Sequence, residues 1–78
     1  MPPTETEQSV PRRLIDEALE RYIDWREACH AVSAAYGQWS RGARGERPLL
    51  FAAYTAALDR EELAATRYSG VISQISPA

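Results

Sequence analysis

Apolar side chains recur every three or four residues along two long stretches of this chain, and polar side chains occupy most positions between them. The first stretch extends from Leu14 to Trp39 and the second from Phe51 to Ile75. This spacing gathers apolar residues on one side of a helix, which is the pattern of an amphipathic helix. We therefore predict two helices, at about residues 11–40 and about residues 48–74.

The predicted helices have recognisable ends. Ser9 offers a hydroxyl that suits a helix N-cap, and Pro11 has the backbone angle of a first helical turn. Residues 41–47 contain two glycines and no large apolar side chain, and Pro48 follows them, so we place the turn there. Residues 1–9 have no apolar periodicity, and we expect them to form a disordered N-terminal tail.

One dipeptide within the second stretch could end its helix early. Gly70, after Ser69, could adopt the left-handed conformation that closes many helices. However, Ile72 and Ile75 continue the apolar spacing beyond it. We therefore predict that the second helix continues through Gly70.

Two helices joined by a short turn pack against each other in antiparallel orientation. The predicted fold is therefore all-α, an antiparallel two-helix hairpin over residues 10–76. Its contact seam follows a heptad spacing typical of coiled coils and consists of Ile15, Tyr22, Trp25, Cys29, Val32, Tyr36, Trp39, Phe51, Tyr54, Leu58, Glu61, Tyr68 and Ile72.

A second set of apolar residues flanks this seam, and we expect it to remain uncovered in a single hairpin. It comprises Leu14, Leu19, Ala28, Ala35, Leu50, Ala57, Ala64 and Val71. A chain of 78 residues buries a small core and usually needs a disulfide, a metal, a partner or unusually regular helix packing to be stable. We therefore expect a homodimer in the form of a four-helix bundle, or binding to a larger protein.

Glu61 is the one acid on the predicted seam of the second helix. Folding the chain at the turn brings it near Trp25, Arg26 and Cys29. A buried carboxylate must be paired or hydrogen-bonded. We interpret Glu61 as a structural residue that forms an ion pair with Arg26 or accepts a hydrogen bond from the Trp25 indole, and we assign no catalytic residue.

A metal site is an alternative at the same level of the hairpin. Glu27 and His30 have the Glu-x-x-His spacing of ferritin-like bundles, and Glu61 and Glu62 lie opposite them. The heptad phase, however, puts Glu27 and His30 on the polar side of their helix, where charged side chains are normally solvated. We therefore predict no metal or other cofactor and keep these residues as the alternative.

The turn carries a second alternative, because Arg41, Arg44 and Arg47 lie close to Trp39 in the sequence. Three arginines could contact nucleic acid or another anion. The net charge of the chain is -2, which gives no general attraction for a polyanion. We expect a solvated loop and no nucleic-acid partner.

Composition narrows the class of protein further. The single cysteine, Cys29, excludes an intrachain disulfide, and no run of apolar residues is long enough to span a bilayer. The first residues lack the basic and apolar regions of a secretory signal, so we expect a cytoplasmic location. No catalytic constellation is present in the sequence. The prediction is a small, non-catalytic helical module for protein-protein interaction or self-assembly.

Overall fold

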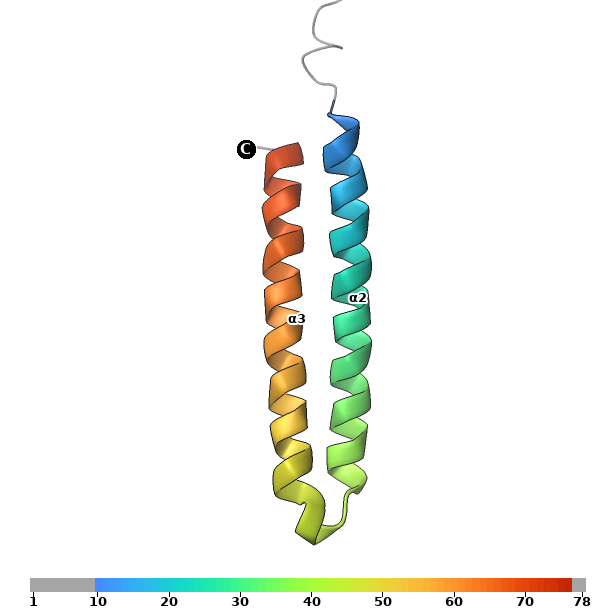
Figure 1. Ribbon diagram of the computed structural model, residues 1–78, viewed down its shortest axis with the longest axis vertical. Coiled ribbons are helices and arrows are strands. Elements are labelled where there is room, and N and C mark those ends of the chain that lie inside the picture. The colour runs from blue at the N-terminus through green and yellow to red at the C-terminus, as the bar shows by residue number, and fades with distance from the viewer. Residues whose placement is uncertain (1–9, 77–78) are drawn as a thin grey trace, which may run out of the picture.

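The computed structural model describes residues 10–76 as two long helices side by side, joined by a tight turn (Figure 1). Helix α2 spans Arg12–Arg41, the 3-10 turn η1 spans Arg44–Glu46, and helix α3 spans Arg47–Ile75. The helices run antiparallel, and the part of the chain that is described is all-α, as predicted. Each helix end lies within a residue of its expected position. Residues 1–9, with the predicted tail and the Ser9 cap, lie outside the described range.

Helix α2 begins directly after Pro11, which occupies the N-cap position. The carbonyl oxygen of Pro11 accepts hydrogen bonds from the backbone N–H groups of Leu14 at 2.9 Å and Ile15 at 3.3 Å. Its φ of -55° and ψ of 137° are those of a residue just before the helix, one position ahead of the first turn in which the sequence placed it. The sequence therefore positions the start of α2 through backbone geometry.

The turn brings Gly42 close to atoms of two other residues. A Cβ atom there would lie 2.2 Å from Cδ1 of the Leu50 side chain and 3.1 Å from the carbonyl oxygen of Gln38. Gly42 has an extended backbone with φ of -71°, so glycine is favoured here by close approach and not by a left-handed conformation. The chain then enters η1 and continues into α3 at Arg47.

Helix α3 passes through Gly70 without a break, which confirms the predicted continuation. Gly70 has no positive φ, and a Cβ atom at this position would meet no other atom within 4 Å. The helix ends at Ile75, where the N–H of Ser76 donates to the carbonyl oxygen of Ile72 at 2.9 Å. Gly70 is therefore an interior helical glycine on the exposed surface of α3.

The core between the helices is thin. Among the described residues, the buried apolar side chains are those of Leu14, Ala28, Ala57 and Val71. The sequence placed these residues on the uncovered flank, so that expectation is wrong. The alanines explain the difference, because small side chains let two helices approach closely and leave no room for an aromatic ring between their axes.

Candidate interaction surface

The residues of the predicted seam lie together on one face of the hairpin, beside the thin core. We call this surface the aromatic face. Heptad steps along α2 connect Ile15, Tyr22, Cys29 and Tyr36, and the same steps along α3 connect Phe51, Leu58 and Ile72. Between these two rows lie the half-buried residues Trp25, Val32, Trp39, Tyr54, Glu61 and Tyr68.

Four aromatic rings form a cluster near the turn, which we call the turn cluster. Trp39 stacks on Tyr54 with ring centroids 5.4 Å apart and planes inclined by 14°, and it contacts Phe51 at 5.0 Å. Tyr36 meets Tyr54 edge to face at 5.6 Å. These rings connect α2 to α3, and such pairs stabilise packing by about 0.5–1.5 kcal/mol each beyond area burial.

A second group of rings, the upper cluster, joins the helices farther from the turn. Trp25 and Tyr68 stack with centroids 6.0 Å apart and an interplanar angle of 9°. Tyr22 lies 5.6 Å from Tyr68 and 6.0 Å from Trp25. The hairpin is therefore fastened along its aromatic face at two levels by rings contributed from both helices.

Glu61 is anchored within the upper part of this face. The indole Nε1 of Trp25 donates a hydrogen bond to Oε2 of Glu61 at 2.8 Å, across 36 residues of sequence. Of the two partners expected for Glu61, Trp25 is the one that forms a bond to it. Arg26 is exposed on the outer side of α2. The bond joins the two helices at a fixed level and satisfies the half-buried carboxylate.

Much of the aromatic face remains in contact with solvent. The exposed fraction is 53% for Tyr36, 46% for Phe51 and 37% for Leu58, and Ile15, Tyr22 and Ile72 are exposed to a similar extent. Large apolar side chains are also exposed outside this face, at Ile23, Leu49 and Leu63, but only the aromatic face gathers rings from both helices, a composition common at protein interaction sites. The sequence missed the exposure of these residues because their spacing alone does not distinguish the centre of a seam from its edge.

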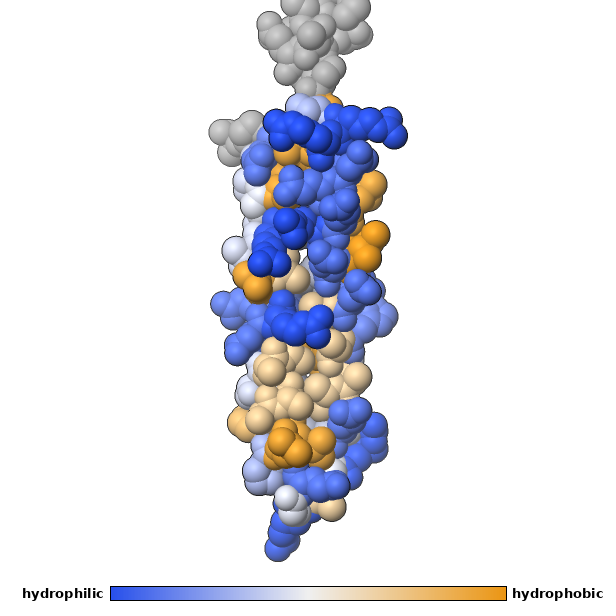
Figure 2. Space-filling model, in the orientation of Figure 1, coloured by the Kyte–Doolittle hydropathy of each residue, from blue (hydrophilic) through white to orange (hydrophobic). Residues whose placement is uncertain are grey.

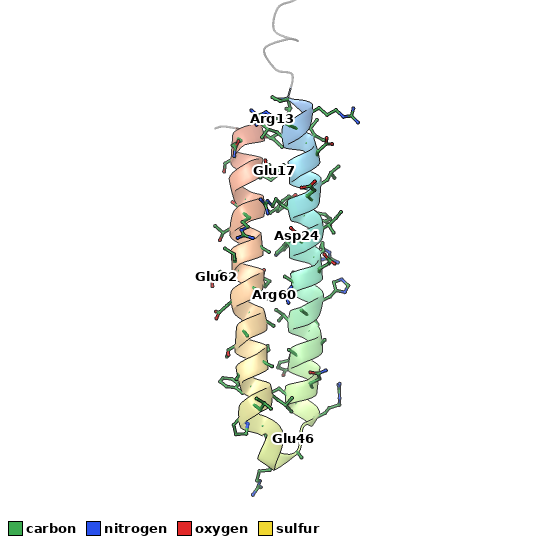
Figure 3. The ribbon with its side chains drawn as sticks, in the orientation of Figure 1. Arg13, Glu17, Asp24, Glu46, Arg60 and Glu62 are labelled. Carbon is green, nitrogen blue, oxygen red and sulfur yellow. The ribbon has the colours of Figure 1, made fainter. Side chains whose placement is uncertain are left out.

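Figure 2 shows the opposite side of the hairpin. This side is charged over the half that lies away from the turn and apolar over the half nearer the turn. Asp24 of α2 and Arg60 of α3 lie near the boundary between the helices (Figure 3). They line a groove together with Arg21, Glu27, Ala28, Leu63, Ala64 and Arg67. Three arginines and two acids line it, so the groove has no strong charge of one sign.

The three arginines considered as an alternative anion site do not converge. The guanidinium of Arg41 folds back beside Gly37, and that of Arg47 lies over the Trp39 ring, 5.7 Å from its centroid. Arg44 is exposed within η1. The structure therefore describes separate contacts for Arg41 and Arg47, the second of them a cation–π contact.

The residues kept as an alternative metal site also diverge. Glu27 and His30 line the outer surface of α2, Glu61 is bonded to Trp25, and Glu62 lies on the side of α3 away from α2 (Figure 3). Over residues 10–76, no three His, Cys, Asp or Glu side chains gather closely enough to hold a metal ion. Nor is either helix in this range long and apolar enough to cross a membrane.

The fold and its surface thus define a helical hairpin with one aromatic face and an opposite side that is charged only over the half away from the turn. A scan against models of protein families finds no match to this sequence. Searches of curated proteins and of solved structures find none either. The aromatic face is therefore the feature of the molecule from which a function can be inferred.

Proposed function

We propose that this chain is a non-catalytic interaction module whose aromatic face binds a second copy of the chain to form a four-helix bundle. The observation that carries the proposal is the combination of a thin core with an exposed apolar face. Only four apolar residues among those described are buried, and two of them are alanines. Chains of this size usually need a disulfide, a metal, a partner or unusually regular helix packing, and a second copy is the one of these that would cover the aromatic face.

The dimensions of the face suit such an assembly. A helix of about 30 residues is about 45 Å long, and the hairpin is 16 Å wide. A second copy that runs along this length can contact the aromatic face from its open end to the turn. Covering the half-exposed rings would remove further apolar area from water, at about 25 cal/mol per Å².

The Trp25–Glu61 pair gives this interface a polar element. In helical bundles a polar residue at the contact can favour one alignment of the helices over others. Because the indole already satisfies one carboxylate oxygen, Glu61 enters the interface as a hydrogen-bonded group. This bond supports a fixed arrangement of the face against which a second copy packs.

The proposal is tested by placing a charge on each side of the hairpin in turn. Leu58, on the aromatic face, is 37% exposed, and Leu63, in the charged groove, is 50% exposed. We expect Leu58→Arg to raise the dimer dissociation constant at least about 30-fold, because an arginine buried without a partner costs about 2 kcal/mol or more. Leu63→Arg is the control on the same helix and should dissociate like the wild type.

Sedimentation equilibrium at several concentrations measures both dissociation constants, and circular dichroism checks that helix content is retained. Equal dissociation of the two variants would contradict the proposed role of the aromatic face. So would a Leu63→Arg variant that dissociates more readily than Leu58→Arg.

A further inference from the structure

We infer that the turn end of the hairpin binds an anionic lipid surface, with Leu49 entering the bilayer interface and the arginines of residues 41–47 contacting headgroup phosphates. This inference concerns the end of the molecule and goes beyond the proposed function, which concerns the aromatic face. It follows from where the charges lie along the hairpin and from the exposure of Leu49 among them.

Charge is distributed unevenly along the hairpin. Residues 28–58 form the part nearer the turn (Figure 1), and their charged side chains are those of Arg41, Arg44, Glu46 and Arg47, a net charge of +2 with histidine neutral. The rest of the chain has six arginines and ten acids, a net charge of -4. The net charge of -2 for the whole chain therefore conceals a positive turn end.

The acids outside this part lie too far from the turn to cancel its charge. Along α3, the first acid after Arg47 is Asp59, twelve residues or about 18 Å away. Along α2, the last acid before Arg41 is Glu27, fourteen residues or about 21 Å away. The Debye length at physiological ionic strength is about 8 Å, so exposed charges at these separations are largely screened from each other. The turn end therefore attracts an anionic surface although the chain as a whole is acidic.

The arginines of the turn are exposed, and their charges are not neutralised by ion pairs within residues 10–76. The ion pair found in this range lies in α2, away from the turn. The contact of Arg47 with the Trp39 ring leaves its positive charge in place. The three guanidinium groups do not converge on one point, as a single bound phosphate would require. A lipid surface presents many headgroups and needs no such convergence.

Leu49 supplies an apolar group at the same end. Its side chain is 76% exposed, the largest exposed fraction of any large apolar residue in the described part of the chain. It belongs to the first turn of α3, and helical side chains lean toward the N-terminus of their helix, so Leu49 leans toward the end of the hairpin. The next residue, Leu50, packs against Gly42 instead.

The combination of Leu49 with the arginines identifies the kind of partner. A single exposed leucine is common on proteins and does not by itself mark a site. Peripheral membrane proteins, however, bind by placing apolar side chains at the acyl boundary while basic side chains remain at the phosphates. Nucleic acid would use the arginines but offers no apolar layer to Leu49. A lipid surface accommodates both.

Cosedimentation of the full chain with vesicles tests the inference. The probe is phosphatidylcholine vesicles that contain about 30% phosphatidylserine, and vesicles of phosphatidylcholine alone are the uncharged comparison. We expect binding to the anionic vesicles and little to the uncharged ones. The partition coefficient should fall as salt is raised from about 0.05 to 0.5 M, because the Debye length shortens.

Two pairs of variants separate the turn end from the rest of the molecule. Leu49→Gln should lower the partition coefficient at least about 5-fold through lost apolar burial, whereas Leu63→Gln, at a 50% exposed position in the charged groove, should bind like the wild type. Arg44→Gln should lower it about 5-fold. Arg26→Gln makes the same change in net charge on the outer side of α2 and should have no effect. Circular dichroism checks that each variant retains its helix content.

Binding that needs anionic lipid, with losses confined to Leu49→Gln and Arg44→Gln, supports the inference. Absence of binding to the anionic vesicles at low salt overturns it, and so do equal losses in Leu49→Gln and Leu63→Gln. Binding to a short DNA duplex that is tighter than to the vesicles, and unchanged in Leu49→Gln, overturns the assignment of a lipid partner.

Discussion

The hydrogen bond from Trp25 to Glu61 is the most specific polar contact between the two helices. Its donor and acceptor come from opposite helices and lie beside the stacked rings of the upper cluster. The one ion pair found among the described residues, Arg21 with Glu17 at 3.8 Å, lies within α2 and does not connect the helices. Partly exposed pairs of that kind contribute little to stability.

We predict that Trp25 and Glu61 are energetically coupled. In a double-mutant cycle of Trp25→Phe and Glu61→Ala, the coupling free energy should be about 1–2 kcal/mol, because the acceptor is charged and partly buried. Urea unfolding measures the four free energies at one protein concentration. Glu61→Gln, which keeps an acceptor oxygen, should lose less stability than Glu61→Ala. Additive effects of the two changes would contradict a structural role for the bond.

Gly42 gives a second prediction at the same scale. Gly42→Ala should destabilise the protein by about 1–3 kcal/mol, because the new methyl group would overlap the Leu50 side chain. Gly45→Ala is the matched control in the same turn, since a Cβ atom at position 45 has open space. Thermal unfolding compares the two. Similar unfolding temperatures for both variants would show that the turn does not need this close approach.

At the scale of the elements, helix positions followed directly from the sequence. Pro11 and Pro48 flank or begin the helices, the glycines between them coincide with the turn, and Ile72 and Ile75 indicated that α3 continues past Gly70. These signals are local, because backbone angles and apolar spacing act over a few residues. They therefore sufficed to place both helices and the turn.

These local signals could not predict how each helix is rotated about its own axis, and so which of its rows of apolar residues faces the other helix. The apolar residues of each helix occupy several neighbouring rows, so the sequence permits more than one row at the centre of the contact. The helices pack through the rows that contain Ala28 and Ala57, because these small residues allow close approach. Tyr22 and Tyr36 therefore lie to one side of the contact. The spacing of apolar residues was enough to predict the fold. Predicting that the aromatic face is exposed would also have required knowing how the side-chain volumes of both helices fit together.

Gly70 provides a prediction for α3 as an element. Gly70→Ala should stabilise the protein by about 0.5–1 kcal/mol, because the residue lies within a continuous helix, its φ is not positive, and the added methyl group meets no atom. Urea unfolding at fixed protein concentration measures the change. A loss of stability would indicate that α3 bends or opens at this glycine.

At the scale of the whole molecule, the hairpin has two unlike sides. One bears the rings and aliphatic side chains of the aromatic face, and the other bears a groove in which Arg60 and Arg67 of α3 lie near Asp24 of α2. Water solvates the charged side well, whereas a continuous apolar side favours association. This asymmetry is the reason for proposing that a second copy covers the aromatic face.

The mass of the wild-type protein in solution tests this account most directly. Sedimentation equilibrium from about 1 to 100 μM should give twice the chain mass of 8.7 kDa, about 17 kDa, with unfolding temperatures that rise with concentration. A folded species of 8.7 kDa throughout this range, with a concentration-independent unfolding temperature, would contradict the central claim that a second copy covers the aromatic face.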